Sequence, residues 1–156
     1  MESNFAGPEL TALFSALVRL EVELWDAVEG RVRAEHAMAL GSYEVMSVIA
    51  REPGCRVHDI AAALSITVGG VSKIVDRIEV GGLCARRANP GDRRSSIIEL
   101  TPAGQRRLAE LTRTVEAELT RRLALAVRDR SPAEFTRMLT DLRAAVRTSD
   151  PDQEAS

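Results

Sequence analysis

The chain has 156 residues, of which 45% are hydrophobic and 28% are charged, and its formal net charge is −2. This apolar content is enough to form a packed core, which excludes disorder over the full length. No apolar stretch approaches the roughly 18 residues that a membrane-spanning helix needs, because charged residues interrupt each one. The first ten residues, MESNFAGPEL, have neither the basic nor the apolar segment of a secretion signal. We therefore expect a soluble protein, without a membrane partner, that stays in the cytoplasm.

Residue types that carry catalysis or bind metals are sparse. Cys55 and Cys84 lack the spacing of a metal site, and His36 and His58 belong to no HExxH-like pattern. The sequence shows no nucleophile constellation, acid–base pair or phosphate-binding loop. We expect no metal, no cofactor and no catalytic residue, hence a protein that is not an enzyme. Both cysteines are expected to be buried as small apolar side chains.

The first half of the chain has the apolar periodicity of four helices. Pro8 suits the first turn of the first helix, and Gly30 suits its end or a break. Ser42 is a plausible N-cap of the second helix, and Gly81-Gly82 suits the end of the fourth. The helices are expected over residues 9–29 (or as far as 35), from Ser42 to the stop at Pro53-Gly54, over 58–64 and over 67–80.

Strand-like runs replace the helical period after residue 82. Two short strands are expected over 83–87 and 95–100, because the sequence ANPGD between them is typical of a turn. Thr101-Pro102 and Ser131-Pro132 each combine a helix cap with a proline at the first position. Two amphipathic helices are therefore expected to follow the hairpin, and the polar residues from Ser149 onward are expected to be disordered.

This order of elements predicts a mainly α fold, a winged helix-turn-helix with a small β-hairpin wing, flanked by long dimerisation helices. The apolar stripes of the long helices exceed what a small winged domain can cover. These helices can pack together within one chain as a bundle, but dimerisation is the favoured interpretation. The expected parts are a dimerisation helix at 9–35, the winged DNA-binding domain at 36–100, dimerisation helices at 101–148 and a disordered tail at 149–156.

One face of the expected helix 67–80 is suited to contact a nucleic acid. Gly69 and Gly70 cost about 1 kcal/mol each relative to alanine, so we expect either a close approach of a DNA duplex there or a tight helix contact inside the domain. Ser72 and Lys73 are placed to contact base edges or phosphates, and Arg77 a phosphate. The candidate DNA-binding residues are Thr67, Gly69, Gly70, Ser72, Lys73, Arg77, Arg93 and Arg94.

Positive charge gathers between positions 86 and 94, where Arg86, Arg87, Arg93 and Arg94 are accompanied by Asp92 as the one acid. These arginines either solvate the hairpin or present a guanidinium to a minor groove. Asp92 is expected to orient Arg94 through a bidentate ion pair. Asp76, on the preceding helix, would repel phosphate, so its expected role is an intramolecular salt bridge.

The run GLCARRANPGDRRSSIIELTPAG, residues 82–104, resembles the wing signature of the MarR family of bacterial transcription regulators. The family pattern has G-L, a later arginine, P-x-D-R-R and then T-x-x-G. The preceding VSKIVDRIEVGGL is similar to the family's recognition helix, and the resemblance covers essentially residues 9–148. Gly69 and Gly70 depart from the family, in which many members have serine or threonine, so hydroxyl contacts are not implied at these two positions.

The resemblance implies a homodimer that places two winged domains on a pseudo-palindromic operator in double-stranded DNA. Recognition helices in successive major grooves imply half-sites about 10 bp apart. Arg94 is implied to be the wing-tip residue that enters the minor groove, with Asp92 as its partner. The first helix lacks the cysteine of the family's peroxide-sensing branch, so thiol sensing is not expected.

The resemblance also implies a repressor that a small, often anionic or phenolic, effector releases from DNA. Such ligands usually sit between the dimer helices and the DNA-binding lobe. Four residues are candidates for that cleft, although Trp25 suits a core or dimer contact equally and His36 a surface or capping role. The candidates are Arg19, Trp25, His36 and Tyr43. The second interpretation is a winged-helix protein that binds another protein, which the net negative charge and the glycine pair allow.

Overall fold

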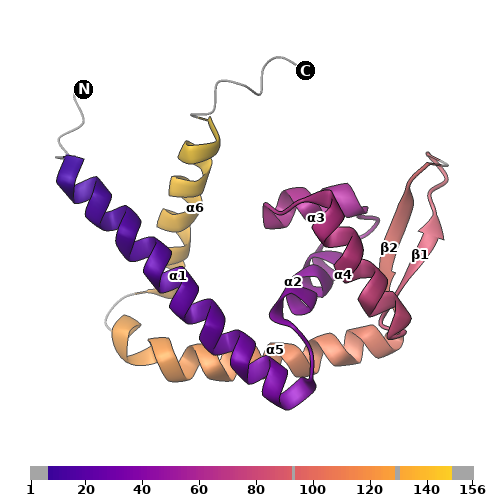
Figure 1. Ribbon diagram of the computed structural model, residues 1–156, viewed down its shortest axis with the longest axis horizontal. Coiled ribbons are helices and arrows are strands. Elements are labelled where there is room, and N and C mark those ends of the chain that lie inside the picture. Colours follow the sequence, from indigo (N-terminus) through magenta and orange to yellow (C-terminus); the bar gives the residue numbers. More distant parts are fainter. Residues whose placement is uncertain (1–6, 93, 129–130, 149–156) are drawn as a thin grey trace. The chain divides into compact units, whose positions relative to one another are not determined.

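The computed structural model describes residues 7–92, 94–128 and 131–148. Within these ranges, six helices and one two-stranded antiparallel sheet follow along the chain (Figure 1). The predicted class, a mainly α winged helix-turn-helix with long flanking helices, is confirmed. The elements are α1 (Gly7–His36), α2 (Leu40–Arg51), α3 (Val57–Leu64), α4 (Val68–Val80), β1 (Cys84–Ala88), β2 (Ser96–Leu100), α5 (Pro102–Val127) and α6 (Pro132–Thr148).

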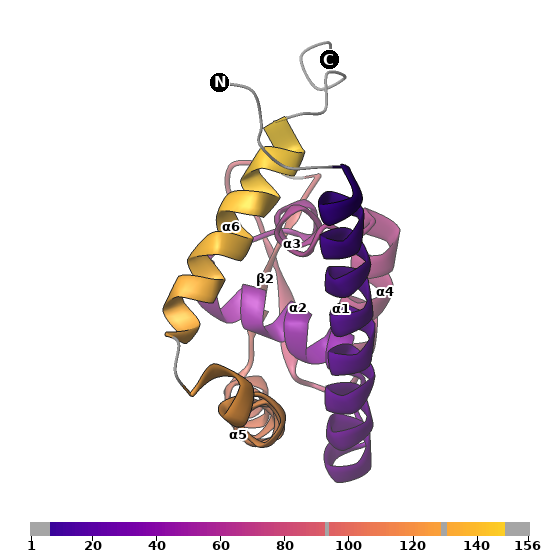
Figure 2. The ribbon, with the colours of Figure 1, turned by 90° about the vertical axis from the view of Figure 1, so that its left-hand side faces the viewer.

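α1 is one unbroken helix, as Figure 2 shows. The end or break predicted at Gly30 is wrong, and the longer of the two predicted boundaries, near residue 35, is the correct one. Val28 and Val32, on either side of the glycine, are buried. Their packing outweighs the roughly 1 kcal/mol that a glycine costs inside a helix. Toward its N-terminus α1 exposes seven large apolar side chains, Leu10, Leu13, Phe14, Val18, Leu20, Val22 and Trp25.

α2, α3, α4 and the hairpin enclose the core. Met46 of α2, Ile60 of α3, Val75 and Ile78 of α4 and Ile98 of β2 are at most 2% exposed. The helical residues among them belong to the apolar stripes of their helices, so the apolar period indicates which face of each helix is buried. Among the described residues, no single helix is long and apolar enough to cross a membrane, and only α3 and α4 taken together, at a bend of 115°, pass on length and composition.

α2 begins three residues earlier than predicted, because its N-cap is Ala39 and not Ser42. Ser42 is buried, and its backbone N–H donates to the carbonyl of Ala39 at 3.0 Å. The N–H of Leu40 donates instead to the carboxylate of Glu29, on α1, at 2.5 Å. A carboxylate from another helix therefore satisfies the first turn of α2, and local spacing does not reveal such a partner.

The wing lies one residue further along the chain than predicted at the start of each strand. β1 pairs antiparallel with β2, with Cys84 opposite Leu100 and Ala88 opposite Ser96. Gly82 precedes the hairpin with a φ of 70°, a left-handed conformation that glycine adopts readily. The side chain of Asn89 closes the loop, because it accepts from the N–H of Gly91 and donates to Ser95, both at 3.0 Å.

The start of α5 is fastened to the end of the wing. The Thr101 hydroxyl accepts from the N–H of Gly104 at 3.0 Å, which confirms the predicted cap, and donates to the carbonyl of Gly82 at 2.7 Å. A Cβ on Gly104 would lie 1.8 Å from the carbonyl oxygen of Leu83. The T-x-x-G spacing thus has a physical cause: threonine caps the helix, and only glycine permits the backbone contact.

The chain divides into two compact units, and the division falls inside α5, between Glu118 and Leu119. The second unit contains the end of α5 and α6. α6 starts where the Ser131-Pro132 pair predicts, and the carbonyl of Ser131 accepts from the N–H of Glu134 at 3.0 Å. No residue of α6 is buried, and its exposed apolar side chains are Met138, Leu139, Leu142 and Val146. The predicted tail at 149–156 lies outside the described residues.

Candidate nucleic-acid interface

α4 begins with a side-chain cap at Thr67. The threonine hydroxyl accepts from the backbone N–H of Gly70 at 3.1 Å. This bond satisfies one of the free N–H groups in the first helical turn and fixes where the helix starts. Thr67 is exposed, so the cap lies at the surface of the domain.

The exposed surface after this cap is bare backbone at Gly69. A Cβ built on Gly69 would meet no atom within 4 Å, whereas one on Gly70 would lie 3.1 Å from the Thr67 hydroxyl oxygen. Within the described residues, a tight helix contact is therefore not the reason for Gly69. The open surface agrees with the alternative, in which another molecule approaches the helix closely.

The basic side chains of α4 and the wing fall into two groups. Arg86 is ion-paired with Asp76 at 2.5 Å and with Glu79, and Arg87 is ion-paired with Glu99. The salt bridge predicted for Asp76 is thus present. Each of these two arginines, here called neutralised, is paired with at least one carboxylate of the same domain, which offsets its positive charge.

Lys73, Arg77 and Arg94 form the second group, which we call the free basic set. All three are exposed, and none forms an ion pair within the part of the chain that the structure describes. Ser72, beside Lys73, is half-buried. The structure therefore leaves uncompensated positive charge on two elements of the same unit, α4 and the wing.

Asp92 contacts Arg94 differently from the prediction. Its carboxylate accepts from the backbone N–H of Arg94 at 2.9 Å, and no ion pair with the guanidinium is found in the described part of the chain. The predicted bidentate pair is therefore wrong, because the short Asp side chain closes an Asx-type turn on the backbone two residues on. This backbone hydrogen bond holds the pKa of the carboxyl below its usual value. Arg93 lies outside the described residues.

Of the four predicted effector residues, Trp25 is the one that lines the cleft of about 370 Å³ between α1, α2 and the end of α3. His36 instead lies 2.8 Å from the hydroxyl of Thr114, on α5, and neither Arg19 nor Tyr43 reaches the cleft. The residues that line it are Glu21, Trp25, Gly41, Glu44, Leu64 and Ile66.

The two carboxylates of this cleft were not identified from the sequence. Glu21 precedes Trp25 by one helical turn, and Glu44 follows Gly41 by three residues on α2. The i, i+4 and i, i+3 spacings place each pair on one helix face, and that spacing is the signal available from the sequence.

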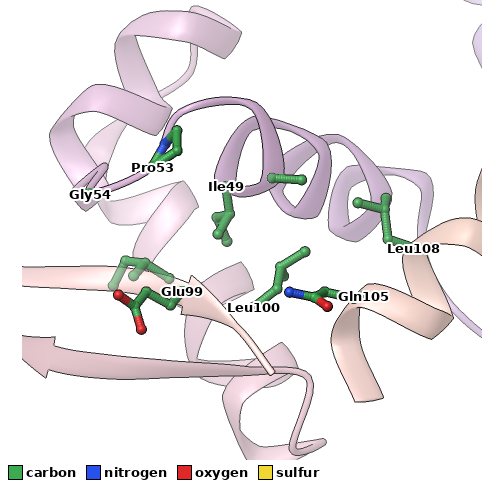
Figure 3. A pocket seen from close by; sticks show the side chains of 9 residues that line it. Ile49, Pro53, Gly54, Glu99, Leu100, Gln105 and Leu108 are labelled. Atoms are coloured by element: carbon green, nitrogen blue, oxygen red, sulfur yellow. The ribbon is translucent and has the colours of Figure 1, made fainter. Parts of the chain in front are cut away.

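A second hollow, of about 520 Å³, lies between the end of α2, β2 and the start of α5 (Figure 3). Figure 3 shows Ile49 of α2 facing Leu100 of β2 and Gln105 of α5. Glu99 is the one charged side chain along it, and this carboxylate is already paired with Arg87. None of the predicted site residues lines this hollow.

Both cysteines are buried, as predicted, and each thiol lies near a backbone carbonyl. Burial raises the pKa of Cys55 and that of Cys84 to about 11, so both remain thiols at neutral pH. Within the described residues, no group of three or more His, Cys, Asp or Glu side chains is placed to hold a metal ion.

Comparisons with known proteins show what this chain is similar to. A relative from Thauera aromatica, provisionally assigned as the transcriptional regulatory protein for the hcr operon, is 33% identical over 75 residues, which is 48% of this chain. The matched region spans only 45% of that relative. BldR from Sulfolobus solfataricus, a transcriptional regulator, has the same fold, with a TM-score of 0.77 and 20% identity over 90% of this chain and 96% of its own.

The repressor CouR, solved bound to a 23-mer DNA duplex, is 25% identical, with a TM-score of 0.71 over 93% of this chain and 99% of its own. These similarities and the geometry define a winged helix-turn-helix protein of the class that includes DNA-binding regulators. The profile of the MarR family matches residues 39–95, from the residue before α2 into the wing. This match agrees with the family resemblance that the wing signature indicated.

Proposed function

We propose that this protein is a sequence-specific, double-stranded DNA-binding transcription regulator, a repressor that a small molecule releases from its operator. The observation that carries the proposal is the free basic set. Arg86 and Arg87 are neutralised by carboxylates, whereas Lys73, Arg77 and Arg94 remain available on α4 and the wing. Uncompensated basic side chains on two elements of a winged domain match the demands of a duplex, whose phosphates supply most of the binding free energy.

In this proposal α4 is the recognition helix. The exposed backbone at Gly69 permits a close approach to the major groove, where Ser72 and Lys73 contact base edges or phosphates. Arg77, further along α4, contacts a phosphate. Arg94 enters the neighbouring minor groove, and the hydrogen bond that its backbone N–H donates to the Asp92 carboxylate fixes the turn that carries it.

A second copy of the chain is the proposed partner of the long helices. α1 and α6 each expose a row of large apolar side chains. Exposed apolar surface of this extent marks an association site in a soluble protein, and a closed dimer covers the same surface on both copies. Two recognition helices then read a pseudo-palindromic operator with half-sites about 10 bp apart.

The ligand that releases the protein is proposed to bind beside Trp25. CouR of Rhodococcus jostii RHA1 has been solved bound to p-coumaroyl-CoA, at 22% identity and a TM-score of 0.70 over 84% of this chain and 88% of its own. In this chain the cleft at Trp25 also touches Ile66, next to the Thr67 cap of α4. A ligand in this cleft would therefore contact the residue next to the start of the recognition helix and could shift that helix. The proposed activity consists of binding and release alone, so the protein does not convert the ligand chemically. It acts on the chromosome, in the cytoplasm.

The experiment is selection of genomic duplex fragments by the purified protein, followed by footprinting. We expect enrichment of a pseudo-palindromic sequence protected in two half-sites about 10 bp apart. Lys73→Ala should lower the preference for that site over random duplex by about 1–3 kcal/mol, while Arg87→Ala, which removes a neutralised arginine, is the matched control. Failure to enrich any duplex would contradict the proposal and favour the interpretation that the winged domain binds a protein.

A further inference from the structure

The cleft beside Trp25 is acidic. It is lined by two carboxylates, Glu21 from α1 and Glu44 from α2, and its lining contains no basic side chain. The rest of the lining is Gly41 and three apolar or aromatic side chains, Trp25, Leu64 and Ile66. At about 370 Å³ the cleft has the size of a small-molecule site.

The charged form of Glu44 is destabilised by its surroundings. It is half-buried, and no hydrogen bond or ion pair engages its carboxylate in the described part of the chain. Burial raises the pKa of Glu44, and the positive charge of Arg51, further along α2, only partly opposes this effect. A carboxylate that loses water without gaining a partner is stabilised by any cation that enters beside it.

Trp25 adds a second attraction for a cation. Its side chain is 41% exposed and lies one helical turn from Glu21. The face of an indole attracts ammonium groups more strongly than any other side-chain ring, and this attraction increases where water is excluded. Leu64 and Ile66 offer apolar surface to the remainder of such a ligand.

We propose that this cleft binds a small organic cation with an apolar group, of the tertiary or quaternary ammonium class, and that this cation is the effector of the regulator proposed above. The assignment of the cation as effector rests on that proposed function, whereas its binding to the cleft does not. An anionic effector, such as an aryl carboxylate, would meet two carboxylates and no basic side chain in the lining. The lining residues therefore favour the opposite ligand charge from that which the family resemblance implies.

The test uses Trp25 itself, which is the only tryptophan in the sequence. Its fluorescence is followed while the full-length protein is titrated with benzyltrimethylammonium, and separately with benzoate, in the absence of DNA. We expect saturable quenching by the cation. Benzoate should bind at least about tenfold more weakly, a difference that corresponds to about 1.4 kcal/mol of binding free energy. Glu44→Gln should weaken the cation at least about tenfold, and Glu21→Gln should act in the same direction.

Glu23→Gln, on the same helix but outside the cleft, is the matched control and should leave both affinities unchanged. Equal binding of benzoate and the cation, no saturable quenching by the cation, or cation binding that survives the loss of both cleft carboxylates would each overturn the proposal. Operator binding by the same samples is measured separately. Cation binding without DNA binding would contradict the proposed function but support the ligand class. DNA binding without cation binding would contradict the ligand class but support the proposed function.

Discussion

Gly104 shows how strictly one residue is dictated by its surroundings. Its position against the carbonyl of Leu83 leaves 1.8 Å for a Cβ, and the obstacle is backbone that cannot rotate away. Gly104→Ala should therefore destabilise the protein by about 3 kcal/mol, at the upper end of the usual overpacking penalty. Thermal or denaturant unfolding measures this loss.

Gly30→Ala is the matched control for that measurement. A Cβ at Gly30 would meet no atom within 4 Å, and alanine is the better helix former by up to about 1 kcal/mol. The control should be neutral or slightly stabilising. Equal stability of the two alanine variants would contradict the account of the junction between the wing and α5.

Residue chemistry predicts charge pairing only partly. The salt bridge of Asp76 was predictable because its carboxylate would repel phosphate on a helix expected to contact DNA, and Arg86 is the cation that pairs with it. The contact of Asp92 was predicted with the right residue but the wrong atom, since its carboxylate accepts from the backbone N–H of Arg94. The sequence brings the two residues together, but a loop conformation decides which donor the carboxylate reaches.

α3 gives a prediction at the scale of one element. The carboxylate of Asp59 accepts from the backbone N–H of Arg56 at 2.8 Å and from its Nε at 3.2 Å. The backbone hydrogen bond is the main reason that the pKa of Asp59 lies below its ordinary value. Asp59→Ala should cost about 1 kcal/mol of unfolding free energy at pH 7, a typical value for a lost helix cap.

The pH dependence of this loss follows from the direction of the shift. A carboxyl whose pKa is lower in the folded state stabilises the fold above its unfolded pKa, and this contribution disappears as the pH falls through the folded pKa. The difference between wild type and Asp59→Ala should be constant from pH 7 to about 5 and shrink below about pH 4. Glu52→Ala, an exposed acid outside the cap, is the control. A difference that persists at pH 2 would show that the cap does not act through the charged carboxylate.

At the scale of elements, apolar period and cap-plus-proline pairs placed the helices well. The start of α5 at Thr101-Pro102 was predictable because both the cap and the first helical residue are local. The start of α2 was not, because Glu29 of another helix accepts from its first N–H. The same reason applies to the cleft: Glu21 and Glu44 come together through packing of two helices, and only Trp25 was identified beforehand.

At the scale of the whole molecule, the chain carries apolar surface that its described residues do not cover. Leu10, Leu13 and Phe14 of α1 are between 45% and 67% exposed. Exposure of this apolar surface to water is unfavourable, so we expect a second copy of the chain to bury it. Such a dimer would place two winged domains on one duplex. The two protected half-sites expected in the footprint are the consequence of this assembly.

The central claim is that the free basic set binds DNA while the neutralised arginines do not, and the salt dependence of affinity for the selected duplex tests it most directly. Each phosphate contact contributes close to one unit to the slope of log K against log salt. We predict a steep slope for wild type, a slope lower by about one unit per subunit for Arg77→Ala, and an unchanged slope for Arg87→Ala. Equal slopes for Arg77→Ala and wild type, or an equal loss in both variants, would contradict the division into free and neutralised arginines.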